Sequence, residues 1–196
     1  MSAISPVTVA EWCGFLRGLA ALDSDPVRGV TAGGLSCQEA EVVWRDSDWP
    51  GREPASEEDV VAAEERLRVQ LPPAYRSFLL TSNGWRATPC SAGLRAAAGI
   101  GWFSDLEPEL LAAWADLGLE FFADTAEILK RCLLISQDDS ASGHYLLLAA
   151  ARADGGRWTA YEWWPGDAGD PEPYDDFVAL VTQLWTRSGA ARGEGP

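Results

Sequence analysis

The chain contains one histidine, His144, and this residue limits the acid–base chemistry that the sequence can support. Nucleophilic catalysis needs a general base beside a serine or a cysteine, and that base is usually histidine. His144 closes the run Ser140-Ala141-Ser142-Gly143-His144, just before a predicted strand. A Ser–His dyad and a plain hairpin position both fit this run. No second catalytic motif accompanies it, so we interpret the protein as a non-enzyme without catalytic residues.

Paired carboxylates could hold a cation or act as acids and bases. They occur at Asp138-Asp139, at Asp175-Asp176 and in Glu57-Glu58-Asp59. These places are typical of turns and helix starts, where Asp and Glu are common for structural reasons. The sequence has no Asp-x-Asp-x-Asp-Gly calcium loop, and its four cysteines form no Cys-x-x-Cys pair. We therefore expect no metal site, no cofactor and free thiols.

The charge is one-sided, with 30 Asp and Glu against 15 Lys and Arg and a formal net charge of −15. Such a field repels phosphate backbones, which argues against direct nucleic-acid binding, and it speeds encounter with a basic protein. High acidity also simply keeps proteins soluble, so both explanations stay open. The first ten residues lack a secretory signal, and the apolar run at 145–151 is too short to span a bilayer. The sequence predicts a cytoplasmic protein without membrane contact.

Acidic residues gather in two segments that contain no Lys or Arg, with seven in residues 105–127 and six in residues 162–176. Such clusters can orient a cationic partner, although a solvated helix and loop explain them equally well. In a strand, Trp163 and Trp164 must point to opposite faces, so one of them should leave the core. An exposed Trp framed by acidic residues is typical of a binding hot spot. We therefore predict a partner-binding surface composed of Trp102, Asp105, Asp138, Asp139, Glu162, Trp164 and Asp167.

The periodicity of apolar residues predicts the elements that must position these side chains. Helices are predicted near 9–20, 56–68, 107–117 and 177–185, the second with a Ser56/Asp59 capping box, and strands at 100–103, 132–136, 145–150 and 158–163. Residues 165–173 are predicted to form a long acidic loop. This order is typical of an α+β fold, with helices packed on one face of an antiparallel or mixed sheet, which leaves the other face able to stay open.

The same pattern predicts three segments along the chain. Residues 1–53 form an accessory N-terminal segment with a helix and a possible strand at 38–44. Residues 54–188 form the main domain, and residues 189–196 form a disordered tail.

A fully specified short helix lies between Leu71 and Trp85. Leu71-Pro72-Pro73 starts it with prolines that need no N–H there, and Asn83-Gly84 supplies a left-handed stop. Between them, Tyr75, Phe78 and Leu79 recur at helical spacing and form one apolar stripe, which we expect to be core rather than contact residues.

This segment resembles the signature of the SUKH superfamily, whose members share a Leu-Pro start, a Tyr and a Phe three residues apart, and a terminal Asn-Gly. The resemblance extends over about residues 54–185. The superfamily contains a fungal cell-wall-synthesis regulator and many bacterial immunity proteins, which bind and neutralise toxins. The resemblance implies an immunity protein, a monomer or weak dimer, that occludes the active surface of a cognate basic toxin such as a nuclease. The alternative is a regulatory scaffold that binds an endogenous partner.

Overall fold

The computed structural model describes residues 6, 8–23, 51–86, 92–116, 120–137, 143–149, 156–167 and 169–190. These residues contain an antiparallel five-stranded sheet in which the strands lie side by side in chain order. The strands are β1 (Gly101–Trp102), β2 (Cys132–Leu134), β3 (His144–Leu148), β4 (Ala160–Trp163) and β5 (Glu172–Tyr174). The predicted α+β class is confirmed, and the possible strand at 38–44 lies outside the described residues.

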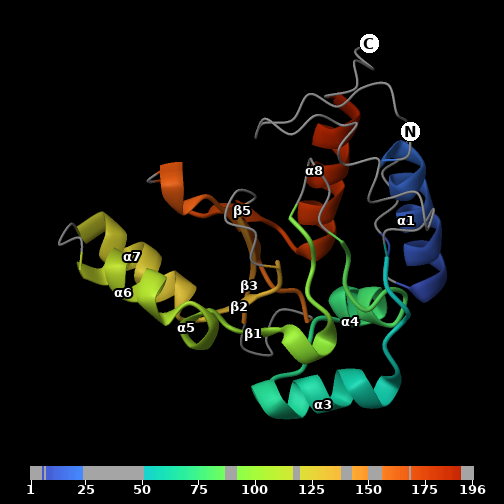
Figure 1. Cartoon of the computed structure of the whole chain (residues 1–196), viewed down its shortest axis with the longest axis horizontal. Helices are drawn as coiled ribbons and strands as arrows, with labels where there is room; N and C mark the ends of the chain where they lie inside the picture. The colour runs from blue at the N-terminus through green and yellow to red at the C-terminus, as the bar shows by residue number, and fades with distance from the viewer. Residues whose placement is uncertain are drawn as a thin grey trace.

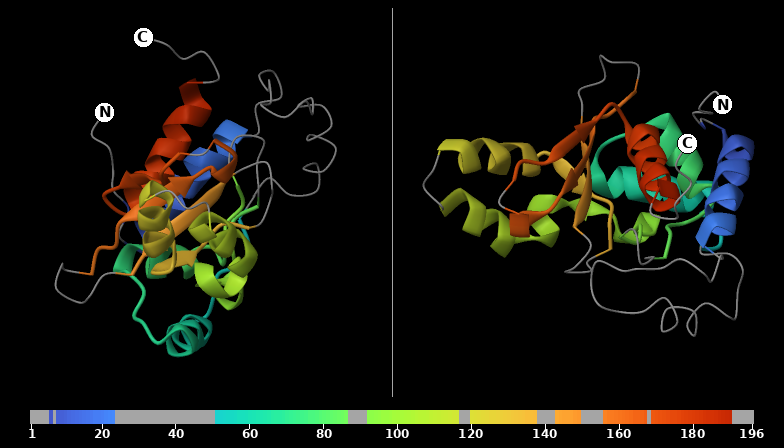
Figure 2. Two further views of the ribbon diagram at one scale, coloured as in Figure 1. Left: turned by 90° about the vertical axis from the view of Figure 1, so that its left-hand side faces the viewer. Right: turned by 90° about the horizontal axis from the view of Figure 1, so that it is seen from above.

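Helices flank the sheet on both sides (Figures 1 and 2). One side carries α1 (Val9–Asp23), α4 (Pro73–Leu79) and α8 (Phe177–Ala190), with α3 (Glu57–Leu67) and the 3₁₀ turn η1 (Ala97–Gly99) close by. The other side carries α5 (Phe103–Leu106), α6 (Pro108–Asp116) and α7 (Glu120–Leu129), and the 3₁₀ turn η2 (Pro165–Asp167) follows β4.

The prediction of one open sheet face is wrong where β2, β3 and β4 meet α6 and α7. All three residues of β2 are buried, and a strand that is apolar at every position needs cover on both of its faces. The main core covers one face. A second apolar cluster covers the other and consists of Phe103, Leu111, Trp114, Ala126, Leu129, Cys132, Leu134, Leu146 and Trp163.

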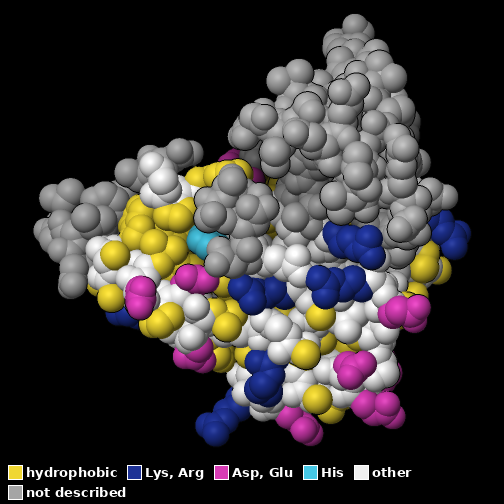
Figure 3. Space-filling model, in the orientation of Figure 1, with side chains coloured by type: hydrophobic (Ala, Val, Ile, Leu, Met, Phe, Trp, Pro, Cys, Tyr) yellow, Lys and Arg dark blue, Asp and Glu magenta, His cyan; other side chains and the backbone are white. Residues whose placement is uncertain are grey.

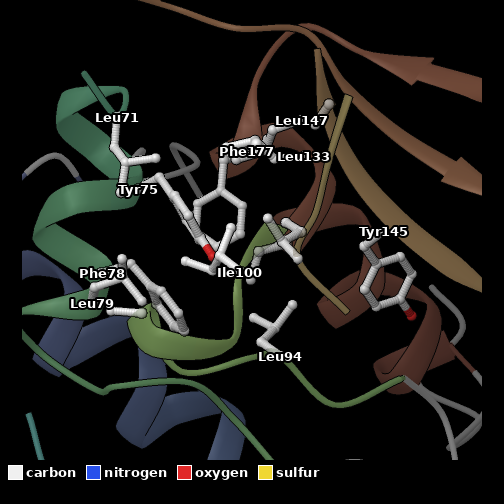
Figure 4. Packing of buried hydrophobic residues seen from close by; sticks show 14 of the residues in the cluster. Leu71, Tyr75, Phe78, Leu79, Leu94, Ile100, Leu133, Tyr145, Leu147 and Phe177 are labelled. Atoms are coloured by element: carbon white, nitrogen blue, oxygen red, sulfur yellow. The ribbon is translucent and has the colours of Figure 1, made fainter. Parts of the chain in front are cut away.

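The signature helix α4 lies at the centre of the main core. Tyr75, Phe78 and Leu79 are fully buried, which confirms that they are core residues. Phe177 at the start of α8 packs against both rings of α4, with ring centroids 4.7 Å from Tyr75 and 5.2 Å from Phe78. Figure 4 shows these side chains converging between α4, α8 and the sheet.

Asn83 and Gly84 do not stop the helix as predicted. They hold the segment after the helix against residues 94–97. The helix ends at Leu79, and the N–H groups of Thr81 and Ser82 both donate to the carbonyl of Phe78. Asn83 Oδ1 accepts from the N–H of Ala97 at 2.7 Å, which holds the start of η1. Gly84 has a φ of 96° and lies directly against the backbone of residues 94–96.

The N-terminal helix α1 completes the same core. Trp12 is fully buried, its indole Nε1 donates to the carbonyl of Ala74 at 2.9 Å, and its ring lies 5.4 Å from Phe78. The boundary after residue 53 stays a prediction, but α1 packs as part of the fold. The predicted capping box at the start of α3 is confirmed, because Ser56 and Asp59 each accept a hydrogen bond from the other's backbone N–H.

Replacing Trp12 by Ala should destabilise the whole domain. The substitution leaves a large cavity beside the signature helix, and it should lower the free energy of unfolding by about 3–5 kcal/mol in urea titrations. Val9→Ala, in the same helix at a position that is 41% exposed, is the control and should change little. An equal, small effect of both variants would mean that α1 is not part of the core.

Replacing Gly84 by Ala should also destabilise the fold. A Cβ there would lie 2.6 Å from the carbonyl oxygen of Leu94, and the left-handed φ strains any side chain. Together these effects should lower the unfolding free energy by about 2–3 kcal/mol. The control is Gly166→Ala, because a Cβ at Gly166 meets nothing within 4 Å. A Gly84→Ala protein as stable as the wild type would refute the close contact between Gly84 and the backbone of residues 94–96.

Candidate partner-binding surface

The structure separates the predicted surface residues. Trp102 in β1 is half-buried and packs against the main core, and its row continues through Leu133, Leu147 and Ala160. Trp164 directly follows the last residue of β4. It lies four positions after Ala160 along the chain, and β4 is three strands away from β1. With strands about 4.8 Å apart, the two Trp residues lie well over 10 Å from each other. They do not form one patch.

The acidic members of the predicted surface also have different environments. Asp105 is exposed in α5, while only the backbone of Asp167 is described, in η2. Asp138 and Asp139 lie outside the described residues. These four positions therefore stay predictions as partner contacts.

Glu162 is corrected from a surface carboxylate to a buried one. Its position in β4 alternates with Trp163, so its side chain lies on the same sheet face as that of Ala160, and it is only 3% exposed. Its Oε2 accepts a hydrogen bond from the Tyr174 hydroxyl on the neighbouring strand at 3.1 Å. Glu162 therefore ties β4 to β5 rather than presenting a free charge to a partner.

Trp163 and Trp164 divide as the alternation of a strand predicts. Trp163 is fully buried, its ring centroid lies 4.9 Å from that of Trp114, and its Nε1 donates to the carbonyl of Gly169 at 3.1 Å. Trp164 is 41% exposed. The prediction that one of the pair leaves the core is confirmed.

The exposed indole of Trp164 is fixed by the glycine beside it. Gly143, just before β3, has a φ of 72°, and a Cβ there would lie 2.9 Å from two ring carbons of Trp164. The indole therefore rests on the glycine backbone, which only a residue without a side chain permits. Figure 3 shows hydrophobic side chains beside His144 on this face of the molecule.

His144 is explained by packing. Its ring centroid lies 5.8 Å from Phe103 and 5.7 Å from Trp163, so it fills space between two aromatic side chains at the end of the sheet. Ser140 and Ser142, the partners of a possible dyad, lie outside the described residues. Burial raises the pKa of the Cys132 thiol to about 12, which keeps this thiol protonated and unreactive at neutral pH.

The acidic segment after β4 is not the long loop that the sequence predicted. It folds into η2 and the edge strand β5, and Asp170 accepts a hydrogen bond at 2.6 Å from the hydroxyl of Thr125 in α7. The carboxylates of Glu172 and Asp175 are exposed. This flank lies directly after Trp164 in the chain, so it can place negative charge beside the exposed indole.

The outer edge of β5 cannot pair with another strand in the usual way. The N–H of Leu148 donates to the carbonyl of Thr159. The backbone N–H and C=O groups of odd-numbered residues in β4 therefore point toward β3, and those of even-numbered residues point toward β5. Pro173, opposite Tyr161, therefore turns its nitrogen outward. Proline has no N–H, so this edge offers no donor at that position.

Neither metal binding nor membrane insertion gains support from the described part of the chain. Within the described ranges, no three His, Cys, Asp or Glu side chains come together as metal ligands would. None of the helices that the structure describes is both long enough and apolar enough to cross a bilayer.

Comparison with known proteins identifies one family. The model of the SMI1 / KNR4 family (SUKH-1) matches residues 54–183, which include every strand of the sheet, the signature helix and the first half of α8. Searches of curated proteins and of solved structures gave no significant match. The matched segment begins after α1, so the helix that supplies Trp12 lies outside it.

Restoring the missing donor on β5 should make the protein self-associate. A Pro173→Val variant presents an outward N–H group on this exposed edge, and edges of this kind pair with one another. Light scattering coupled to gel filtration should show a larger, concentration-dependent mass than that of the wild type. The control is Pro165→Val in η2, away from that edge, which should behave as the wild type. An unchanged mass of the Pro173→Val variant would mean that Pro173 does not protect the edge.

Proposed function

Because this chain belongs to the SMI1 / KNR4 family (SUKH-1), we propose that it is a non-catalytic binding protein that neutralises a cognate bacterial toxin. The family as a whole fits protein-binding roles, both immunity and regulation. Occlusion of the toxin's active or substrate-binding surface is the mechanism that we propose. The exposed Trp164, fixed on Gly143, is the observation that carries this proposal.

The position of Trp164 has the properties of an interface anchor. Its indole is large, 41% exposed and packed against the backbone of Gly143. Aromatic anchors of this kind carry a large share of the binding energy in many protein interfaces. Apolar clusters cover the sheet on both faces. Trp164 and Gly143 lie at the ends of β4 and β3, outside these covered faces.

Charge supports a basic partner at this anchor. From residue 164 to residue 176, a segment that begins at Trp164 and leaves out the buried Glu162, the chain has five acidic residues and no Lys or Arg. A negative flank beside an apolar anchor steers a cationic surface and orients it as it docks. Toxins that act on nucleic acids have cationic substrate-binding surfaces, because they must bind phosphate. An acidic binder is complementary to such a surface.

The second candidate function is that of a regulatory scaffold for an endogenous partner. The family identification fits this role equally, and the same surface would serve it. The two proposals differ in the identity of the partner. Affinity capture of the tagged full chain from its native cells, at low and at high salt, separates them.

Each outcome of this capture has a defined meaning. Recovery of one toxin domain that salt releases supports immunity through electrostatic complementarity. Recovery of an endogenous regulatory protein refutes the toxin proposal in favour of the scaffold. If the captured protein binds equally well at high salt, the electrostatic part of the mechanism is wrong.

Replacing Trp164 by Ala should weaken binding of the captured partner. Loss of an interface aromatic should cost about 2 kcal/mol, which is roughly a thirtyfold increase in Kd in titration calorimetry. Val61→Ala is the matched control, because Val61 is similarly exposed at 40% but lies in α3. Circular dichroism should confirm that both variants fold. Full binding by a folded Trp164→Ala protein would sink the site assignment.

A further inference from the structure

The exposed indole of Trp164 has one covered face and one open face. A Cβ at Gly143 would lie 2.9 Å from both Cδ2 and Cε2 of Trp164. These are the two carbons that the five-membered and six-membered rings share, so the glycine lies over the middle of the indole and not at its edge. Trp164 is nevertheless 41% exposed, so the exposed part of the ring is its opposite face and its edge.

The indole of Trp164 is also chemically unengaged. Trp12 and Trp163 donate their indole N–H groups to backbone carbonyls and pair with other aromatic rings. Within the described ranges, the side chain of Trp164 takes part in no hydrogen bond and in no aromatic pair. Its open π face and its N–H group are therefore available to a partner.

The segments that carry this indole and its glycine are anionic. Residues 158–186 contain six acidic residues and no Lys or Arg, and residues 132–151, which include β2 and β3, also contain no Lys or Arg. Glu172, which stands opposite Glu162 on β5, is exposed on the same sheet face as Glu162. These segments supply no Lys or Arg of their own to the indole, so a guanidinium or an ammonium group there would come from a partner.

We propose that the open face of Trp164 binds an arginine side chain of the protein partner. This inference rests on the function proposed above and names the chemical group that the anchor recognises. A guanidinium lies flat on an aromatic ring and keeps its N–H donors in its own plane, where carboxylates accept from them. The ammonium group of lysine is compact, strongly hydrated and not flat, so arginine suits this indole better than lysine does.

The acidic surroundings favour a cation over an apolar side chain at this place. A carboxylate beside a bound apolar side chain loses hydration and gains no partner. A guanidinium compensates this loss because it donates hydrogen bonds to carboxylates, and Trp is the aromatic side chain that attracts cations most strongly. If the partner acts on nucleic acid, an arginine stacked on Trp164 is no longer available to bind phosphate, and the contact would contribute to inhibition in this way.

Leu106 provides a comparison within the same chain. It is 37% exposed and also lies against a glycine, because a Cβ at Gly101 would lie 2.9 Å from its side chain. An aliphatic side chain has no π system, so Leu106 offers a partner an apolar contact alone. Of the four large hydrophobic side chains that are exposed in the described part of the chain, only that of Trp164 is aromatic.

The test compares the binding of two fluorescein-labelled peptides, hexa-arginine and hexalysine, by the full chain in fluorescence anisotropy. The two peptides carry the same charge, so their long-range attraction to the acidic chain is equal. Trp164→Leu keeps an apolar side chain but removes the ring. It should weaken the binding of hexa-arginine about fivefold and that of hexalysine by no more than about twofold. Leu106→Ala is the matched control and should leave the binding of both peptides unchanged.

Three results would overturn the proposal. The wild type does not bind hexa-arginine, Trp164→Leu weakens the binding of both peptides equally, or Leu106→Ala has the same effect as Trp164→Leu. Thermal unfolding of each variant should confirm that loss of binding is not loss of fold. The proposed function is tested separately, because affinity capture uses no peptide. If Trp164→Ala loses the captured partner while Trp164→Leu still binds hexa-arginine as the wild type does, the arginine contact is refuted and the anchor role of Trp164 stands.

Discussion

Four aromatic rings, from Trp12, Tyr75, Phe78 and Phe177, meet around the signature helix, and their contacts hold α1, α4 and α8 together. These helices come from the two ends and the middle of the described chain, so the rings connect what the sequence separates. The turn after α4 then fixes the neighbouring segments, because Gly84 lies against residues 94–96 and Asn83 holds Ala97. The signature residues therefore specify packing. Because Tyr75, Phe78 and Leu79 are buried, they hold the fold together and are not themselves part of the protein surface.

This construction restricts how a partner can reach the sheet. Apolar clusters lie on both of its faces, and Pro173 removes an N–H donor from the outer edge of β5. The exposed Trp164 lies at one strand end. Strand addition at β5 is therefore disfavoured, and the contact that we propose is made by side chains.

The sequence predicts those parts of the fold whose signals are local. The stripe Tyr75, Phe78 and Leu79, the capping box of Ser56 and the separation of Trp163 from Trp164 all depend on spacing along a single element. The errors come from contacts between elements. The helix α7 was missed although Thr125, Ala126 and Leu129 are buried at helical spacing, and β5 was missed because two prolines argue against a strand. Glu162 was assigned to the surface because its partner Tyr174 becomes visible only once β5 pairs with β4.

The most direct test of the central claim is hydrogen–deuterium exchange of the full chain, free and bound to its captured partner. Our account predicts slower exchange on binding in residues 143–149 and 160–167, around Trp164, with unchanged exchange in α3. Protection confined to α3, with no change around Trp164, would contradict the account. The domain would then bind through a surface that neither its exposed aromatic residue nor its acidic flank explains.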